Sequence, residues 1–211
     1  EGALVLLDGV DRRGVAFPGA APPRAAELVW LGPTRVAELG FGLTPGLHVT
    51  DAGEAYAARW VPVAAEGARG PWTPDRATLA LSPDATRLLV SAWRFAAGPC
   101  RLGVWPLDDR ARDLPLAAVE GSHPRSFAAC WLDDGALALV LEGGDGRVRV
   151  VRYDPVTRAM TTGRSVPFEA GSELFRLRSP TGPWLGLDWY DPTVGGWRLA
   201  LVPAAGLGGS T

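Results

Sequence analysis

The stretch that decides the fold is LALSPDATRLLVSAW, residues 79–93. Two short apolar runs flank a turn that contains Pro83 and Asp84. Proline presets the φ angle that a turn needs, and an aspartate side chain accepts hydrogen bonds from the backbone that follows it. Two runs of this length around such a turn predict a β-hairpin.

The same pattern occurs three more times along the chain. The copies are VWLGPTRVAELGF at 29–41, ACWLDDGALALVL at 129–141 and LRSPTGPWLGLDW at 177–189. The turns are centred on Pro33, Asp84, Asp134 and Thr181, with steps of 51, 50 and 47 residues. A nearly constant step of this size is typical of propeller blades and other repeat arrays.

Each hairpin is followed by a third and a fourth apolar run. The third runs are GLHV at 46–49, RLGVW at 101–105, RVRVV at 147–151 and WRLALV at 197–202. The fourth runs are WVPV at 60–63, LPLA at 114–117 and SVPF at 165–168, each with a proline. Proline has no N–H for the ladder, so we expect the fourth strand to be an outer edge strand. Four antiparallel strands of this kind form a propeller blade.

Two segments carry a resemblance to known families. LSPDATRLLV at 81–90 resembles the first hairpin of TolB-like and WD40-like propeller blades, and YDPVTR at 153–158 resembles the turn between their third and fourth strands. The resemblance implies a β-propeller. It also implies that ligands and partners meet the face built by the loops between blades and by the loops between second and third strands.

We therefore predict an all-β fold of β-propeller blades of four antiparallel strands, about four to five in number, in a single domain over residues 1–211. The expected blades lie near 26–65, 76–119, 126–168 and 173–205. Residues 1–18 contain two further runs, 3–7 and 14–17, that are similar to the last two strands of a blade. They either complete the final blade or belong to a fragment of a larger propeller. The second alternative is favoured, because 3–7 and 197–202 compete for the third-strand role.

Composition excludes several classes of function. The formal net charge is −2, without the clustered positive charge that nucleic acid binding requires. No apolar run approaches the ~18 residues of a membrane-spanning helix, so no membrane insertion is expected. The first residues lack a basic segment, so they do not form an intact signal peptide, and the compartment (cytoplasm or periplasm) stays open. Lys, Ile, Asn and Gln are absent, which indicates a bacterial genome of high GC content.

The sequence contains no motif that predicts catalysis. It has no G-x-S-x-G, no phosphate-binding loop and no H-E-x-x-H. Its two histidines, His48 and His123, are interpreted as a strand residue and a loop residue. The glycine-rich segment 142–146 lacks the alternating ligands of a calcium loop. We therefore expect no enzymatic activity, no cofactor and no metal, with Cys100 and Cys130 reduced and buried.

Tryptophan is abundant, with nine residues. Trp30 and Trp131 are assigned to one repeat position, and Trp93 and Trp189 to another. Residues that recur at one position of successive blades pack between sheets, so these four are expected in the core.

The binding candidates lie on the predicted loop face. They are Arg69, Trp72, Arg76, Arg94, His123 and Arg125, with Arg24, Glu142 and Asp145 around them. The longest loop, 67–76, is the one place where arginine and tryptophan meet outside a strand, a composition typical of binding hot spots. Because this loop is expected to be free of packing demands, replacing Trp72 and Arg125 by Ala should weaken binding and leave the melting temperature nearly unchanged. Arginines outnumber acids in this set, so an anionic or acidic partner is expected.

The leading hypothesis is a non-catalytic interaction or scaffold module that binds a protein or a small anionic partner through its loop face. Two alternatives stay open: the propeller domain of a larger bacterial hydrolase, and a propeller that binds a sugar or another small molecule. The sequence does not set the oligomeric state, and the fold alone does not decide among these functions.

Overall fold

A computed structural model describes residues 28–40, 46–51, 57–67, 72, 74–94, 98–108, 113–123, 127–142, 147–166, 173–181, 183–204 and 207. These residues form fifteen β-strands, and no α-helix occurs among them. The predictions that concern residues 1–18, Arg24, Arg69, Arg125, Asp145 and Pro167 lie outside this part of the chain.

The strands form four antiparallel meanders in chain order, which are called the first, second, third and last sheet below. The first is β1 (Leu28–Trp30), β2 (Arg35–Gly40), β3 (Gly46–Asp51) and β4 (Ala57–Ala65). The second is β5 (Arg76–Leu81), β6 (Arg87–Trp93), β7 (Arg101–Pro106) and β8 (Leu114–Ala118). The third is β9 (Ala128–Trp131), β10 (Leu137–Glu142), β11 (Val148–Tyr153) and β12 (Met160–Val166). The last has three described strands, β13 (Glu173–Thr181), β14 (Trp184–Asp191) and β15 (Gly196–Pro203).

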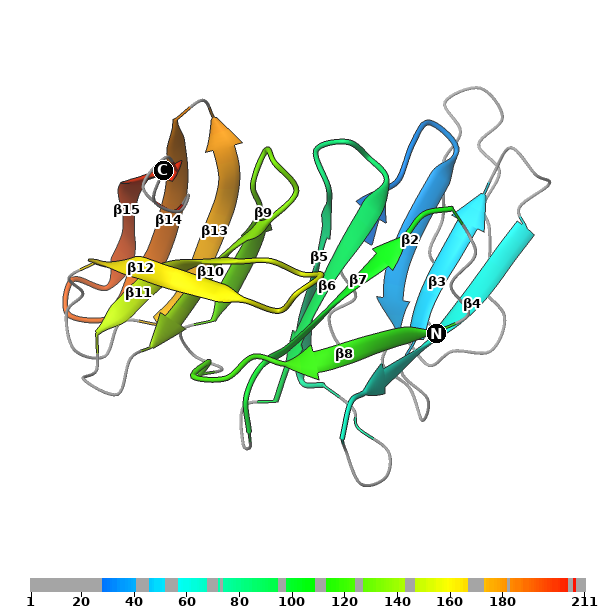
Figure 1. Ribbon diagram of the computed structural model, residues 1–211, viewed down its shortest axis with the longest axis horizontal. Coiled ribbons are helices and arrows are strands. Elements are labelled where there is room, and N and C mark those ends of the chain that lie inside the picture. The colour runs from blue at the N-terminus through cyan, green and yellow to red at the C-terminus, as the bar shows by residue number, and fades with distance from the viewer. Residues whose placement is uncertain are drawn as a thin grey trace.

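The meanders stand side by side as the blades of a propeller. The first strand of each meander contacts the first strand of the next: β1 contacts β5, β5 contacts β9, and β9 contacts β13. Figure 1 shows the resulting row, with the first sheet (blue to cyan) and the last sheet (orange to red) at opposite ends of the molecule. The all-β propeller fold predicted from the sequence is confirmed by this arrangement.

Alternation of side chains along the strands fills the space between neighbouring sheets. In the second sheet, Leu88 and Val90 belong to the cluster shared with the first sheet, whereas Leu89 belongs to the cluster shared with the third. A third cluster joins the third and last sheets around Val140 and Leu187. Successive residues of a strand point to opposite faces, so each inner sheet contributes to two cores.

The outer strands of the first two sheets are not free edges. Val63–Ala65 of β4 pairs in parallel with Leu114–Leu116 of β8, which joins the two meanders into one eight-stranded sheet. The expectation of an outer edge strand is therefore wrong over these residues. Pro115 lies opposite Ala64 in this short ladder and contributes no N–H to it.

The tryptophan predictions are confirmed in part. Trp131 is fully buried against the second sheet, and Trp93 and Trp189 are buried too. Trp30 is 55% exposed, because no sheet precedes the first one within the described residues. Trp93 and Trp189 do not share a repeat position: Trp93 faces the following sheet and Trp189 the preceding one.

Candidate interaction site

Antiparallel order places the connections between sheets at one end of the strands, here called the loop end. In the second sheet the loop end contains the start of β5, the end of β6 and the start of β7. The backbone N–H of Asp75 donates to the carbonyl of Trp93 at 2.9 Å, and that of Val119 to the carbonyl of Cys100 at 2.8 Å. These bonds hold Asp75 and Val119 against the strand ends at the loop end.

Three predicted binding residues meet at this end. Arg76 opens β5 and pairs in register with Trp93, and Arg94 directly follows Trp93, so both arginines lie at the loop end of the second sheet. Both side chains are exposed. His123 lies in the connection that leaves β8 and is exposed as well. Strand order thus places Arg76, Arg94 and His123 at the loop end of the second sheet.

Buried side chains pack at the loop end of the second sheet, close to the arginines in sequence. The ring of Trp93 meets that of Phe127 edge to face, with centroids 6.2 Å apart, across the second and third sheets. Behind them, the hydroxyl of Ser122 accepts a bond from the N–H of Cys100 at 2.8 Å and donates one to the carbonyl of Val119 at 2.6 Å. A support of this kind holds surface side chains without further ordering of the backbone.

His123 contacts an acidic residue of the next sheet. Its Nδ1 lies 3.8 Å from a carboxylate oxygen of Glu142, at the end of β10. The separation exceeds a hydrogen bond, so the pair attracts mainly through charge, and only when the imidazole is protonated. Both side chains are exposed by 40% or more, so solvent screens the attraction. Within the described residues, no group of three or more His, Cys, Asp and Glu side chains is placed to hold a metal.

Trp72 differs from its predicted environment. Its side chain is half-buried against the core between the first two sheets, and the guanidinium of Arg101 lies 5.6 Å from its ring centroid. The expectation that this loop tryptophan is free of packing demands is therefore corrected. Trp72 anchors the connection between β4 and β5 to the core and presents only part of its ring.

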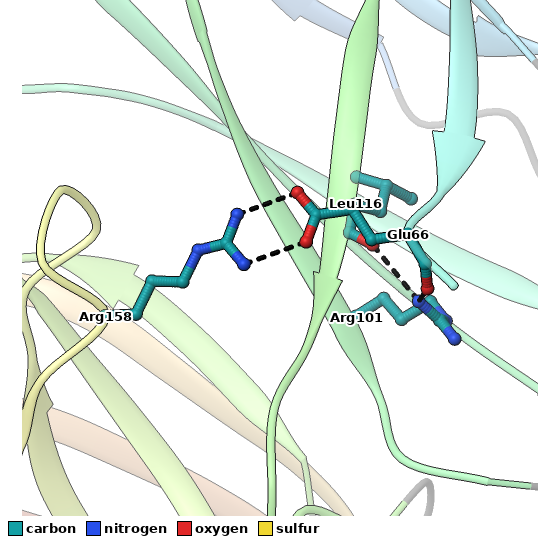
Figure 2. A network of polar contacts seen from close by, with 4 residues as sticks. All are labelled: Glu66, Arg101, Leu116 and Arg158. Carbon is teal, nitrogen blue, oxygen red and sulfur yellow. Dashed lines mark hydrogen bonds and ion pairs between the residues drawn. The ribbon is translucent and has the colours of Figure 1, made fainter. Parts of the chain in front are cut away.

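Sequence reasoning missed the ionic contact that joins the outer parts of three sheets (Figure 2). Glu66 follows β4 and accepts two bonds from Arg158, at 2.8 Å to Oε2 and 2.7 Å to Oε1. Arg101 donates to the carbonyls of Glu66 at 2.7 Å and Leu116 at 3.2 Å. Hydrogen bonding from Arg158 holds the pKa of Glu66 below its usual value. No local pattern predicts this contact, because its partners are 92 residues apart.

No family model matches the chain, and no curated protein matches it. Among solved structures it is similar to a structural genomics protein of unknown function from Bacteroides thetaiotaomicron, with 13% identity, a TM-score of 0.46 and coverage of 89% of this chain and 46% of the other. It is also similar to the GH43 endo-arabinanase from Bacillus licheniformis, with 13% identity, a TM-score of 0.45 and coverage of 83% and 69%. The chain spans less than half the length of the first.

Likeness at this level gives no information on activity, and the fold assignment rests on the strand pairing described above. Within the described part of the chain, no helix is long and apolar enough to cross a membrane.

Proposed function

We propose that the chain is a non-catalytic propeller module that binds an acidic protein surface through the loop end of its second sheet. The observation that carries the proposal is the pair of exposed arginines at the loop end: Arg76 opens β5, and Arg94 directly follows the neighbouring strand β6. Guanidinium groups bind carboxylates with two parallel hydrogen bonds, and two of them at the same end of one sheet favour a partner with clustered acids.

The support beneath the arginines favours binding. Trp93 and Phe127 are buried, so these two residues are held in place before a partner arrives. A support that is packed before binding reduces the entropic cost of binding. His123 belongs to the same proposed surface, whereas the predicted residues Arg69 and Arg125 lie outside the described residues.

The experiment compares two variants against an acidic probe, a poly-glutamate peptide, by titration calorimetry at two salt concentrations. The double change Arg76→Glu and Arg94→Glu is expected to weaken binding at least tenfold, about the effect of losing one ordinary hot spot. Val156→Glu is the matched control, because Val156 is 82% exposed in the turn between β11 and β12, away from the loop end. Equal binding by the double variant and the wild type, or no binding by either, would contradict the proposal.

A further inference from the structure

One of the two histidines of this chain lies at the proposed binding surface. The chain contains only His48 and His123. Histidine is the side chain whose charge ordinarily changes between about pH 5 and pH 8. His48 lies within β3, where burial lowers its pKa. His123 is exposed in the connection that leaves β8, so it is the histidine placed to change the charge of the loop end.

Backbone contacts place His123 close to the arginines of the loop end. Arg76 pairs in register with Trp93 at the end of β6, and β7 lies on the other side of β6. Ser122, the neighbour of His123, accepts a hydrogen bond at 2.8 Å from the N–H of Cys100, directly before β7. Neighbouring strands are about 4.8 Å apart, so the backbones of His123 and Arg76 are on the order of 10–15 Å apart. This separation is close to the screening length of about 10 Å at 0.1 M salt, so both charges act on one bound partner.

His123 also lies beside a carboxylate of the third sheet. Its Nδ1 is 3.8 Å from an oxygen of Glu142, at the end of β10. The loop ends of the second and third sheets meet here, because Trp93 packs edge to face on Phe127. While the imidazole is neutral, the carboxylate of Glu142 repels an acidic partner. A proton on His123 places a compensating positive charge next to that carboxylate.

The other charged groups of the loop end have both signs. Besides Glu142, the charged side chains that the strand order brings to this end within the described residues are Asp75, Arg76, Arg94, Arg101, Glu120 and Arg147. Carboxylates and guanidinium groups ordinarily hold their charge between about pH 5.5 and pH 7.5, so such groups form a constant background in this range. Because acids and arginines offset each other in this background, one additional proton changes the net charge of the surface substantially.

We propose that protonation of His123 regulates the loop end, so that the surface binds its acidic partner more tightly as the pH falls. This inference rests on the proposed function, because it concerns the same surface and the same class of partner. Protonation adds one exposed charge, which corresponds to a change in affinity of about two- to fivefold. Binding and protonation are reciprocal, so an acidic partner that prefers the charged imidazole also draws a proton onto it.

The first test measures the binding of a poly-aspartate peptide by titration calorimetry at low salt, at about pH 5.5 and about pH 7.5. The wild type is expected to bind about two- to fivefold more tightly at the lower pH. His123→Gln should keep the weaker affinity at both pH values, and His123→Arg the tighter one. His48→Gln, the matched control in β3, should retain the pH dependence. A pH dependence that survives unchanged in His123→Gln overturns the inference.

Proton uptake on binding gives a second readout. Calorimetry at about pH 6.5 in two buffers of different ionisation enthalpy measures it, and the difference between the wild type and His123→Gln removes any titration of the peptide. The wild type is expected to take up more protons than His123→Gln. Glu142→Gln should bind more tightly than the wild type at about pH 7.5 and keep the uptake, because it removes the repelling carboxylate and leaves the imidazole.

The outcomes separate this inference from the proposed function. Wild-type binding that is equal at both pH values, with no more proton uptake than His123→Gln, overturns the regulation by His123 and leaves the acidic partner standing. Absence of wild-type binding at both pH values overturns the proposed function and the inference together. Circular dichroism of each variant at both pH values verifies that the fold is retained.

Discussion

Glu66 and Arg158, 92 residues apart, form a two-bonded ion pair that ties the outer strand of the first sheet to the third sheet. Arg158 adopts a positive φ of 61° in the turn that begins at Asp154. The turn is fixed by the carboxylate of Asp154, which accepts bonds from the N–H groups of Val156 at 2.8 Å and Thr157 at 3.2 Å. The turn thus fixes the backbone of Arg158 before the ion pair forms, which reduces the conformational entropy lost in pairing.

This pair should give a small, pH-dependent contribution to stability. The pKa of Glu66 is lowered in the folded state. Its contribution is therefore present above the unfolded pKa of about 4.3 and is lost as pH falls through the lower folded value. Both side chains are more than a third exposed, so the coupling should be about 0.2–1 kcal/mol. A cycle of Glu66→Gln, Arg158→Ala and the double variant, unfolded in urea at pH 7 and pH 3, measures it. Equal coupling at both pH values would contradict the assignment.

Gly103 should not tolerate a side chain. A Cβ at this position would clash with the backbone carbonyl oxygen of Pro115 and lie 2.9 Å from the side chain of Leu116. The backbone cannot move aside without disturbing β8. Gly103→Ala is expected to lower the free energy of unfolding by about 1–3 kcal/mol, the usual cost of overpacking. Gly196→Ala is the matched control, because a Cβ there meets nothing within 4 Å. Chemical denaturation of both variants measures the difference.

The two cysteines should be unreactive in the folded protein. Both are free and buried, and burial raises the pKa of each thiol to about 12. The thiolate is the reactive form, so at pH 8 almost none is present. A chromogenic thiol reagent should titrate neither Cys100 nor Cys130 in native protein and both in denaturant. Rapid labelling of either thiol in the native state would show that its sheet-to-sheet core opens readily.

The all-β fold and its hairpins could be predicted from the sequence because their signals are local. A Ser-Pro-Asp turn forms through its own backbone: Ser82 and Asp84 bond each other, and Asp84 also accepts from the N–H of Thr86 at 3.1 Å. These bonds lower the pKa of Asp84 to about 2. The alternation of apolar residues that predicts a strand is likewise contained within that strand and depends on no distant residue.

Contacts between sheets could not be predicted in the same way. The parallel pairing of Val63 with Leu114 depends on how two sheets approach each other, and no turn or periodicity encodes that approach. The exposure of Trp30 likewise depends on whether a sheet precedes it, not on its repeat position. Trp93 lies nine residues after the turn residue Asp84, whereas Trp189 lies eight residues after the turn residue Thr181. A shift of one residue reverses the direction of a strand side chain, so the two tryptophans point to opposite faces of their sheets.

Trp72 decides whether the loop after β4 is a binding surface or part of the fold. The sequence predicts that replacing it affects binding and leaves the melting temperature unchanged. The structure predicts otherwise, because its ring packs on the core between the first two sheets and lies 5.6 Å from the guanidinium of Arg101.

Trp72→Ala should therefore lower the free energy of unfolding by about 1–3 kcal/mol, less than the 3–5 kcal/mol of a fully buried tryptophan because the ring is only half-buried. Trp72→Phe should recover part of the loss through its remaining apolar and cation–π contact. The exposed Trp30, changed to Ala, supplies the comparison for loss of a tryptophan outside the core. If the melting temperature of Trp72→Ala equals that of the wild type, Trp72 contributes nothing to the core and its assignment to the binding surface holds.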